Sequence, residues 1–387
     1  MRISSNTMFN FNVAAMNQLQ AQLAQTQEQA ASGTQLLNAA ANPVAYTQVM
    51  ALTQTDAITN QQAANITAAT NTLSIAGNTT MSVTNLLQSI RSNAISAEDG
   101  TLSNATRATM ANTMNGQLQQ LMSLANSTDG MGNYLFSGFQ SSTPSFSINS
   151  SGTVVYNGDS GQQLVQASNG RQIQVNDSGA SVFMNVKNGN GTFSATAATA
   201  NTGTGVINAG SVTNPASLTG DSYSIAFAVS AGVTTYTVTD TTTSTTVTTA
   251  QPYTSGQTIA FGGMQVSIQG APANGDNFKV TPSTNQSIFQ TITNMINTLN
   301  TPISGASVAN GMSNGILNLD NAISHISTVE ASQGLRLNEL SMLQTSSTSM
   351  DVQLKQSIST LQDTNYTTTI TTLNQQPARL TAAGSAW

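Results

Sequence analysis

The apolar positions of this chain follow a helical period near both ends of the sequence and a different pattern in the middle. One stripe has the alternating three- and four-residue spacing of a coiled-coil seam. Its members are Ile66, Ala69, Leu73, Ala76, Thr80, Val83, Leu87, Ile90 and Ala94. A second stripe with this spacing contains Ile316, Leu319, Ile323, Ile326, Leu337 and Leu340. Each stripe needs an apolar partner, so we expect the two segments to pack on each other.

Weaker stripes, and the residues that interrupt them, predict further helices. The predicted helices cover residues 1–41, about 44–96, about 104–126, about 288–299 and about 312–375. Gly33 and then Asn42-Pro43 should interrupt the first, since proline lacks an amide donor and disfavours a helical residue before it. Ser103 or Asn104 can cap the third, which carries Leu118 and Leu121 in its seam. Pro377 is expected to end or kink the last helix.

The middle of the chain, from about residue 141 to 284, has a strand-like pattern. Short runs such as Thr153–Tyr156, Tyr223–Val229 and Met264–Ile268 alternate in hydrophobicity and are separated by Gly and Asn. This pattern is typical of an all-β sandwich or barrel. Residues 188–215, rich in Gly, Asn, Thr and Ala, are expected to be loop-like and could divide the region in two.

These elements predict an α+β fold, in which long antiparallel coiled-coil-type helices from both chain ends form an elongated rod with a central all-β insertion domain. The predicted domains are terminal helices at 1–43 and 345–387, a helical rod domain at 44–140 and 285–344, and an outer β domain at 141–284. The rod-core seam would consist of Ile66, Leu73, Val83, Leu87, Ile90, Leu118, Leu121, Ile316, Leu319, Ile323, Ile326, Leu337 and Leu340.

The outermost helices have poor seams. They are rich in Thr, Asn and Ser, which are roughly 0.5 kcal/mol per residue worse than Ala in a helix, and helix stability in proteins comes mainly from packing. We therefore expect residues 1–41 and 345–387 to become ordered when copies of the chain supply the missing surface. The candidates for this subunit interface are Val13, Met16, Leu19, Leu23, Leu354, Leu361, Ile370 and Leu373.

The composition suits a protein that lies against copies of itself. Only 6% of the 387 residues are charged, against roughly 25% in an ordinary soluble domain. A net charge of −6 with scattered lysines gives no footprint for nucleic acid. No run of about 18 apolar residues predicts a membrane span, and no cleavable signal peptide is recognised. The absence of cysteine is consistent with export of an unfolded chain.

The sequence offers little chemistry for catalysis. His325 is the single histidine, so a zinc site would need carboxylates or water as its other ligands. A packing or surface role for His325 is expected instead. No nucleophile elbow, P-loop, complete dinucleotide fingerprint or EF-hand spacing occurs. We therefore predict no catalytic, cofactor-binding or metal-binding residues, no cofactor, and no enzymatic activity.

Several segments resemble the flagellar hook-associated protein 3 family. The most specific is Leu124–Phe139, with the sequence LANSTDGMGNYLFSGF. The start Met1-Arg2-Ile3-Ser4, the loop Asn38–Ala45, the segment Thr143–Phe146 and the helical motif Gly334–Leu340 are also similar to it. The resemblance covers about 1–146 and 275–380. Family members usually continue beyond the position of Trp387 with a further helical stretch, so this end is either unusual or shortened.

The resemblance implies a structural protein of the extracellular bacterial flagellum, secreted through the flagellar type III export channel. It would form the junction ring between the hook and the flagellin filament, with terminal helices inside and the β domain outside. The implied partners are copies of itself, hook-associated protein 1, flagellin, and a cytosolic export chaperone before secretion. No nucleic-acid or membrane partner is expected.

Three alternatives remain open at this point. A flagellin-type filament subunit would share the helical architecture. A surface adhesin could use the central β domain for binding. A secreted hydrolase with a site in that domain has only composition-level support.

Overall fold

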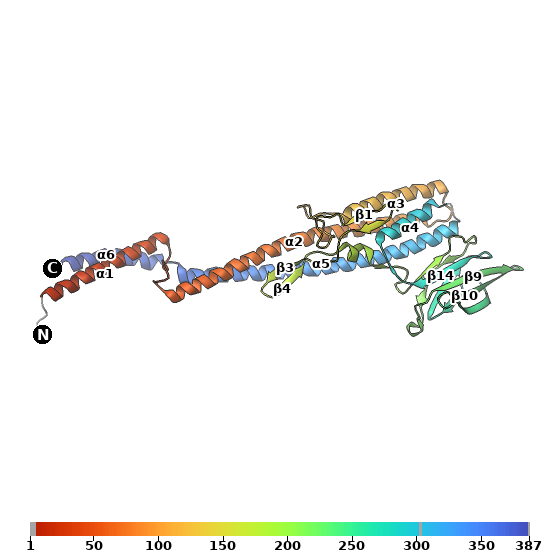
Figure 1. Ribbon diagram of the computed structural model, residues 1–387. Coiled ribbons are helices and arrows are strands. Elements are labelled where there is room, and N and C mark those ends of the chain that lie inside the picture. Colours follow the sequence, from red (N-terminus) through yellow and green to blue (C-terminus); the bar gives the residue numbers. More distant parts are fainter. Residues whose placement is uncertain (1–4, 302–303, 386–387) are drawn as a thin grey trace. The chain divides into compact units, whose positions relative to one another are not determined.

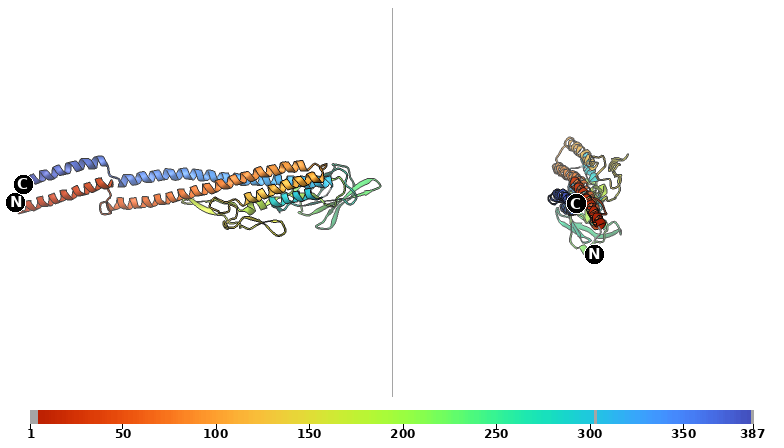
Figure 2. Two further views of the ribbon diagram at one scale, coloured as in Figure 1. Left: turned by 90° about the horizontal axis from the view of Figure 1, so that it is seen from above. Right: turned by 90° about the vertical axis from the view of Figure 1, so that its left-hand side faces the viewer.

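The computed structural model of the chain describes residues 5–301 and 304–385. The start Met1-Arg2-Ile3-Ser4 and the end at Trp387 lie outside the described residues. The chain divides into two compact units. Unit 1 comprises residues 1–68, 166–172 and 340–387, and unit 2 comprises residues 69–165 and 173–339. Figures 1 and 2 show the ribbon from three directions, coloured along the sequence.

Helices come from both ends of the chain, as the stripes predicted, but the C-terminal end forms two where one was expected. They are α1 (Ser5–Ser32), α2 (Pro43–Ala97), α5 (Gly305–Gln362) and α6 (Tyr366–Ser385). In unit 1, α1 and α6 pack side by side, as Figures 1 and 2 show. The first helix ends at Ser32, well before the predicted limit of residue 41, because Gly33 adopts a φ of +74°.

The prediction of a single helix over 312–375 is wrong. The chain breaks between α5 and α6, where Asp363 forms an isolated β-bridge with Thr34. The amide of Gln35 donates to the carbonyl of Gln362 at 2.8 Å, and the amide of Thr364 donates to the carbonyl of Gly33 at 2.9 Å. The chain breaks after α1 and after α5 therefore satisfy each other's backbone hydrogen-bonding groups. Pro377 does not end its helix, because α6 continues to Ser385.

Two shorter helices complete the helical part of unit 2. Helix α3 (Asn104–Ala125) begins after Ser103, whose hydroxyl accepts a hydrogen bond from the amide of Thr106, as the capping pattern predicted. Helix α4 (Ile288–Asn300) is capped in the same way by Ser287. The two helices pack on each other and on the apolar seam of α2 and α5.

The β-rich region contains two differently packed parts. Its first part has the hairpins β1 (Phe146–Ile148)–β2 (Val154–Tyr156) and β3 (Leu164–Ser168)–β4 (Arg171–Gln174), then the π-helix η1 (Ala180–Met184) and β5 (Val186–Lys187), which pairs with β15 (Asn285–Gln286). Phe146 and Phe183 from this part are buried in the same cluster as the seam of α2 and α5. These residues therefore complete the helical core of unit 2.

The second part has its own core. One antiparallel sheet has the order β11-β10-β9-β14-β6, and a second joins β12, β13 and β7, with β8 also paired to β13. The strands are β6 (Phe193–Ala197), β7 (Val206–Ile207), β8 (Ser211–Val212), β9 (Tyr223–Ser230), β10 (Val233–Asp240), β11 (Thr245–Pro252), β12 (Thr258–Phe261), β13 (Met264–Gln269) and β14 (Asn277–Pro282), with a short 3-10 helix η2 (Pro215–Ser217). Phe193, Ile225 and Phe278 are among the residues of this core. The expectation of a loop over 188–215 is wrong in part, since β6, β7 and β8 lie there.

Candidate assembly surface and helical seam

Most of the predicted seam residues lie on the two long helices α2 and α5, whereas Leu118 and Leu121 lie on α3. Those of unit 2 that are fully or almost fully buried are Leu73, Val83, Leu87, Ile90, Leu118, Leu121, Leu319 and Ile326. Ile316, Ile323 and Leu337 are only partly buried. In unit 1, Ile66 and Leu340 are both buried. Because the three- and four-residue spacing is a local property of each helix, it identifies these positions without knowledge of the partner.

Polar side chains cross the seam of unit 2 between its apolar layers. Arg91 pairs with Asp320, and the hydroxyl of Thr84 donates to Glu330 at 2.7 Å. Farther along, the buried amide of Gln333 accepts a hydrogen bond from the Thr80 hydroxyl at 3.0 Å. A polar group within a seam costs stability but fixes which layers face each other.

Gln333 also belongs to a buried network that holds the segment after β4. Its amide nitrogen donates to Asp177 Oδ2 at 2.9 Å. Arg336 Nη2 lies 2.9 Å and 2.7 Å from the two carboxylate oxygens of Asp177, and Nη1 donates to the carbonyl of Gln174 at 3.2 Å. Arg336, which belongs to the family-like motif Gly334–Leu340, thus holds the segment after β4 against α5.

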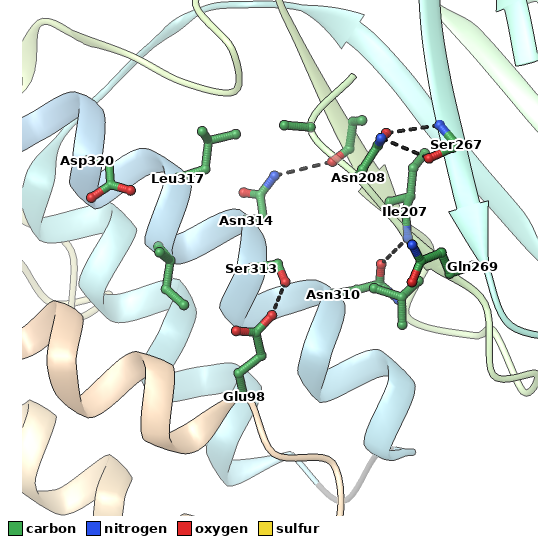
Figure 3. A pocket seen from close by; sticks show the side chains of 14 residues that line it. Glu98, Ile207, Asn208, Ser267, Gln269, Asn310, Ser313, Asn314, Leu317 and Asp320 are labelled. Atoms are coloured by element: carbon green, nitrogen blue, oxygen red, sulfur yellow. Dashed lines mark hydrogen bonds between the residues drawn. The ribbon is translucent and has the colours of Figure 1, made fainter. Parts of the chain in front are cut away.

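A row of asparagines on α5 attaches the backbone of the β-rich region to the helices. Asn310 accepts from the amide of Ile207 at 2.9 Å, Asn318 accepts from the amide of Gly189 at 2.8 Å, and Asn314 donates to a neighbouring carbonyl. Figure 3 shows Asn310 and Asn314 of this row beside a cleft, and the cleft has a volume of about 470 Å³. The two carboxylates at the cleft are engaged, since Glu98 accepts from Ser313 and Asp320 pairs with Arg91. The carboxylates and asparagines named here are therefore already bound to other groups of the chain.

The predicted interface residues of unit 1 differ in exposure. Ile370 is 49% exposed and Val13 is 36% exposed. Met16, Leu19, Leu23, Leu361 and Leu373 are partly buried. Leu354 is only 7% exposed, so its surface is already covered inside the unit and is not available to a neighbouring copy. The α1–α6 pair also contains a buried hydrogen bond from the Gln376 amide to the Thr26 hydroxyl at 3.0 Å.

Sequence reasoning missed the most exposed apolar side chains of unit 1. These are Met8, Phe9, Phe11, Val44, Met50, Met342, Met350, Val352 and Tyr366. They fall outside the strongest seams, and a lone apolar residue beside a stripe carries no signal of its own. Together they leave large apolar side chains on the helices of unit 1 that the pairing within the unit does not cover.

The net charge is distributed unevenly between the two units. Unit 1 contains four basic residues (Arg2, Arg171, Lys355, Arg379) and four acidic residues (Glu28, Asp56, Asp351, Asp363), so the formal charge of −6 belongs to unit 2. Even the charges of unit 1 are locally balanced: a hydrogen bond from the Lys355 ammonium, 2.9 Å long, holds the pKa of Asp351 below its ordinary value. Copies of unit 1 can therefore approach one another without net repulsion.

The described residues contain little that suggests catalysis. His325 Nε2 lies 2.6 Å from the carbonyl oxygen of Ser181, which fits the predicted packing role. Among the described residues, no group of three or more His, Cys, Asp or Glu side chains is placed to hold a metal ion. None of the described helices is long and apolar enough to cross a membrane.

Two family models match the chain. Residues 3–141 match the bacterial flagellin N-terminal helical region, and residues 196–282 match the D2-like domain of flagellar hook-associated protein 1. Among curated proteins, flagellar hook-associated protein 3 of Salmonella typhimurium is 32% identical over 186 residues, which is 48% of this chain and 58% of the relative. The Escherichia coli protein of the same name is 32% identical over 183 residues, or 47% of this chain and 57% of the relative. The match thus spans less than two thirds of these curated relatives.

Solved structures extend the similarity over most of the chain. The crystal structure of flagellar hook-associated protein 3 from Legionella pneumophila has a TM-score of 0.75 and 33% identity, covering 81% of this chain and 98% of that one. The flagellar protein FlgL from Xanthomonas campestris has a TM-score of 0.72 and 30% identity, covering 79% and 98%. These structures therefore share the fold of about four fifths of this chain. The chain therefore belongs to the flagellar hook-associated protein 3 family.

Proposed function

We propose that this chain is a structural subunit of the bacterial flagellum that forms the junction between the hook and the flagellin filament. The curated relatives are named flagellar hook-associated protein 3, and a similar solved structure is that of a flagellar junction protein. In this proposal, copies of the chain associate side by side, bind hook-associated protein 1 on one side and receive flagellin on the other. The chain acts outside the cell after export through the flagellar secretion channel, and a cytosolic chaperone holds it before export.

The observation that carries the proposal is the surface of unit 1. It has no net charge and exposes many large apolar side chains on α1, α2, α5 and α6. Such a surface is costly in a solitary soluble protein and becomes favourable when identical surfaces cover it. We place the terminal segments 1–43 and 345–387 in the inner part of the assembly and the β-rich part, 141–284, on its outside. The proposed boundary at residue 345 divides the chain by role and does not coincide with the end of a helix, since α5 continues through it.

Deletion of the gene tests the proposal. Cells without the protein should build hooks, lack filaments and release flagellin into the medium, and a plasmid with the full chain should restore filaments. Normal filaments in the deletion strain would contradict the proposal.

A matched pair of α6 variants tests the role of the unit 1 surface. Ile370→Asp places a charge on an exposed apolar position, whereas Asn374→Asp places one on an exposed polar position of the same helix. Both proteins should be secreted and keep the thermal unfolding of the unmodified chain, but only the Ile370 variant should fail to restore filaments. Equal complementation by both variants would show that this surface is not an interface.

A further inference from the structure

One turn of unit 2 exposes a large aromatic side chain in a fixed position. Phe136 points inward and is completely buried beside Phe183, with ring centroids 5.3 Å apart. Three residues later, Phe139 is 64% exposed. The turn between them depends on Gly138, which has a φ of +71°. The same short segment therefore anchors one phenylalanine in the core and presents another to the outside.

The backbone of this turn is held from several directions. The amide of Phe139 donates to Asp159 Oδ1 at 2.9 Å. The carbonyl of Gly138 accepts from Gln163 Nε2 at 2.9 Å and from Asn176 Nδ2 at 3.2 Å. A Cβ at position 138 would lie 2.1 Å from the same Asp159 oxygen, so only glycine allows this approach. The position of the exposed ring is thus determined by four other residues.

The ring itself also has a fitted support. A Cβ added to Gly161 would lie 2.2 Å from Cδ2 of Phe139, which means that the ring rests directly on the glycine backbone. Its opposite side is open to solvent. A rigid, exposed aromatic side chain loses little conformational entropy on binding, and such residues are the usual anchors of protein interfaces. This arrangement indicates a protein partner with an apolar recess.

Charge narrows the choice of partner surface. A second copy of unit 2 carries the full −6 and would repel the first, whereas unit 1 has no net charge. Unit 1 also has a suitable recess between α2 and α5, with a volume of about 430 Å³ and only neutral lining residues. Leu52 and Leu361 are its apolar lining residues, and its polar lining residues are Gln48, Gln356, Ser357 and Thr360.

We propose that Phe139 of one copy inserts into the recess between Leu52 and Leu361 of the next copy. The contact joins two different surfaces of the same chain, which is the head-to-tail type that builds rings and helical arrays. It rests on the proposed function, because it presumes that copies lie beside one another. Beyond that function, the proposed contact specifies which residues meet between copies, and it assigns a role to Phe139 at the exposed end of the Leu124–Phe139 segment.

Cysteine crosslinking tests the contact directly, because the natural chain has no cysteine. Phe139→Cys and Gln356→Cys are produced as separate chains in one deletion strain, and oxidation of the isolated flagella should give a disulfide-linked dimer of the two. Ile148→Cys, which replaces another exposed apolar residue of unit 2, is the control and should not crosslink to Gln356→Cys. Equal crosslinking by both, or no crosslink between Phe139→Cys and Gln356→Cys in flagella that contain both chains, would overturn the proposal.

Substitutions provide an independent measurement. Phe139→Ala should weaken self-association of the purified chain by about tenfold or more, and Ile148→Ala should leave it unchanged. Gly161→Ala keeps the phenylalanine but displaces its ring, so it should weaken association as well. Association of Phe139→Ala at the unmodified strength would refute the contact. If even the unmodified chain neither associates nor restores filaments, it is the proposed function that fails.

Discussion

The buried ion pair between Arg336 and Asp177 leads to a quantitative prediction about the stability of unit 2. The two side chains are only 13% and 15% exposed, and the guanidinium reaches both carboxylate oxygens. Arg336→Met removes the charge and the donors but keeps much of the aliphatic length. Asp177 is then left with hydrogen bonds from the amide groups of Gln333 and Gln174, and the carbonyl of Gln174 loses a donor.

The magnitude follows from the charge that stays behind. Removing one partner of a fully buried ion pair costs about 3–5 kcal/mol, because the remaining charge is uncompensated. The residual exposure of this pair lets some water reach the carboxylate, so we expect a loss of about 2–4 kcal/mol. Asp177→Asn combined with Arg336→Met removes both charges and should be less destabilised than Arg336→Met alone by about 1–2 kcal/mol.

Denaturant unfolding of the four proteins of this double-mutant cycle gives the free energies, and hydrogen exchange locates the effect. In Arg336→Met, amides of residues 173–177 should exchange faster, while those of the β9–β10 pair should keep their protection. A loss below about 0.5 kcal/mol for Arg336→Met would refute the reasoning, since the pair would then behave as an exposed one. A double variant that shows the sum of the two single losses would refute it as well.

Three further outcomes are expected. The hydrogen bond from Lys355 lowers the pKa of Asp351, so this carboxylate stabilises the folded state at neutral pH, and the stabilisation is lost as the pH falls below the ordinary carboxyl range. In thermal melts from pH 7 to pH 3, the melting temperature of Asp351→Asn should therefore decline less than that of the unmodified chain. Phe183→Ala empties a fully buried site beside three other phenylalanine rings and should cost about 3–5 kcal/mol, measured by denaturant unfolding, whereas a cost below about 1 kcal/mol would mean that the cluster collapses around the gap. Ala250 has a φ of +43°, so Ala250→Gly should raise the melting temperature of the β-rich part in calorimetry by relieving about 1 kcal/mol of strain, and an unchanged or lower temperature would contradict this.

The long helices could be predicted wherever the spacing of apolar residues along one segment is enough to define a helical face. The stripe from Ile66 to Ala94 is buried throughout, since its spacing already defines one face of a helix. The break between α5 and α6 could not be found in this way. It depends on a bridge from Asp363 to Thr34, which are more than three hundred residues apart in sequence. Nothing in the local residues near Asp363 distinguishes it from the polar positions around it.

The same distinction applies to the candidate surfaces. Leu354 was predicted to face a neighbouring copy because its helix has a thin stripe, but burial depends on the partner helix, and here that partner covers it. Phe139 was visible only as part of a family-like segment. Its exposure results from glycines at 138 and 161 and from an aspartate at 159, which become neighbours only after folding. Exposure is therefore the property that sequence patterns predict least well.

The polar crossings of the seam explain why two regions of one helical pair can serve different purposes. An apolar heptad seam alone tolerates a shift by a whole repeat, whereas a charged or buried polar pair specifies one register. Unit 2 has such pairs in Arg91–Asp320 and in the Thr80–Gln333–Asp177 network, so its register is determined within the chain. In unit 1, the hydrogen bonds that cross between helices include neutral ones, from Ser347 to the carbonyl of Thr59 and from Gln376 to Thr26. Unit 1 also has a charged crossing, where Asp56 of α2 meets Asp351 and Lys355 of α5. Where its pairing rests on neutral groups and partly exposed apolar residues, it can adjust when further helices pack against it, which is the property that an assembling subunit needs at its contact surface.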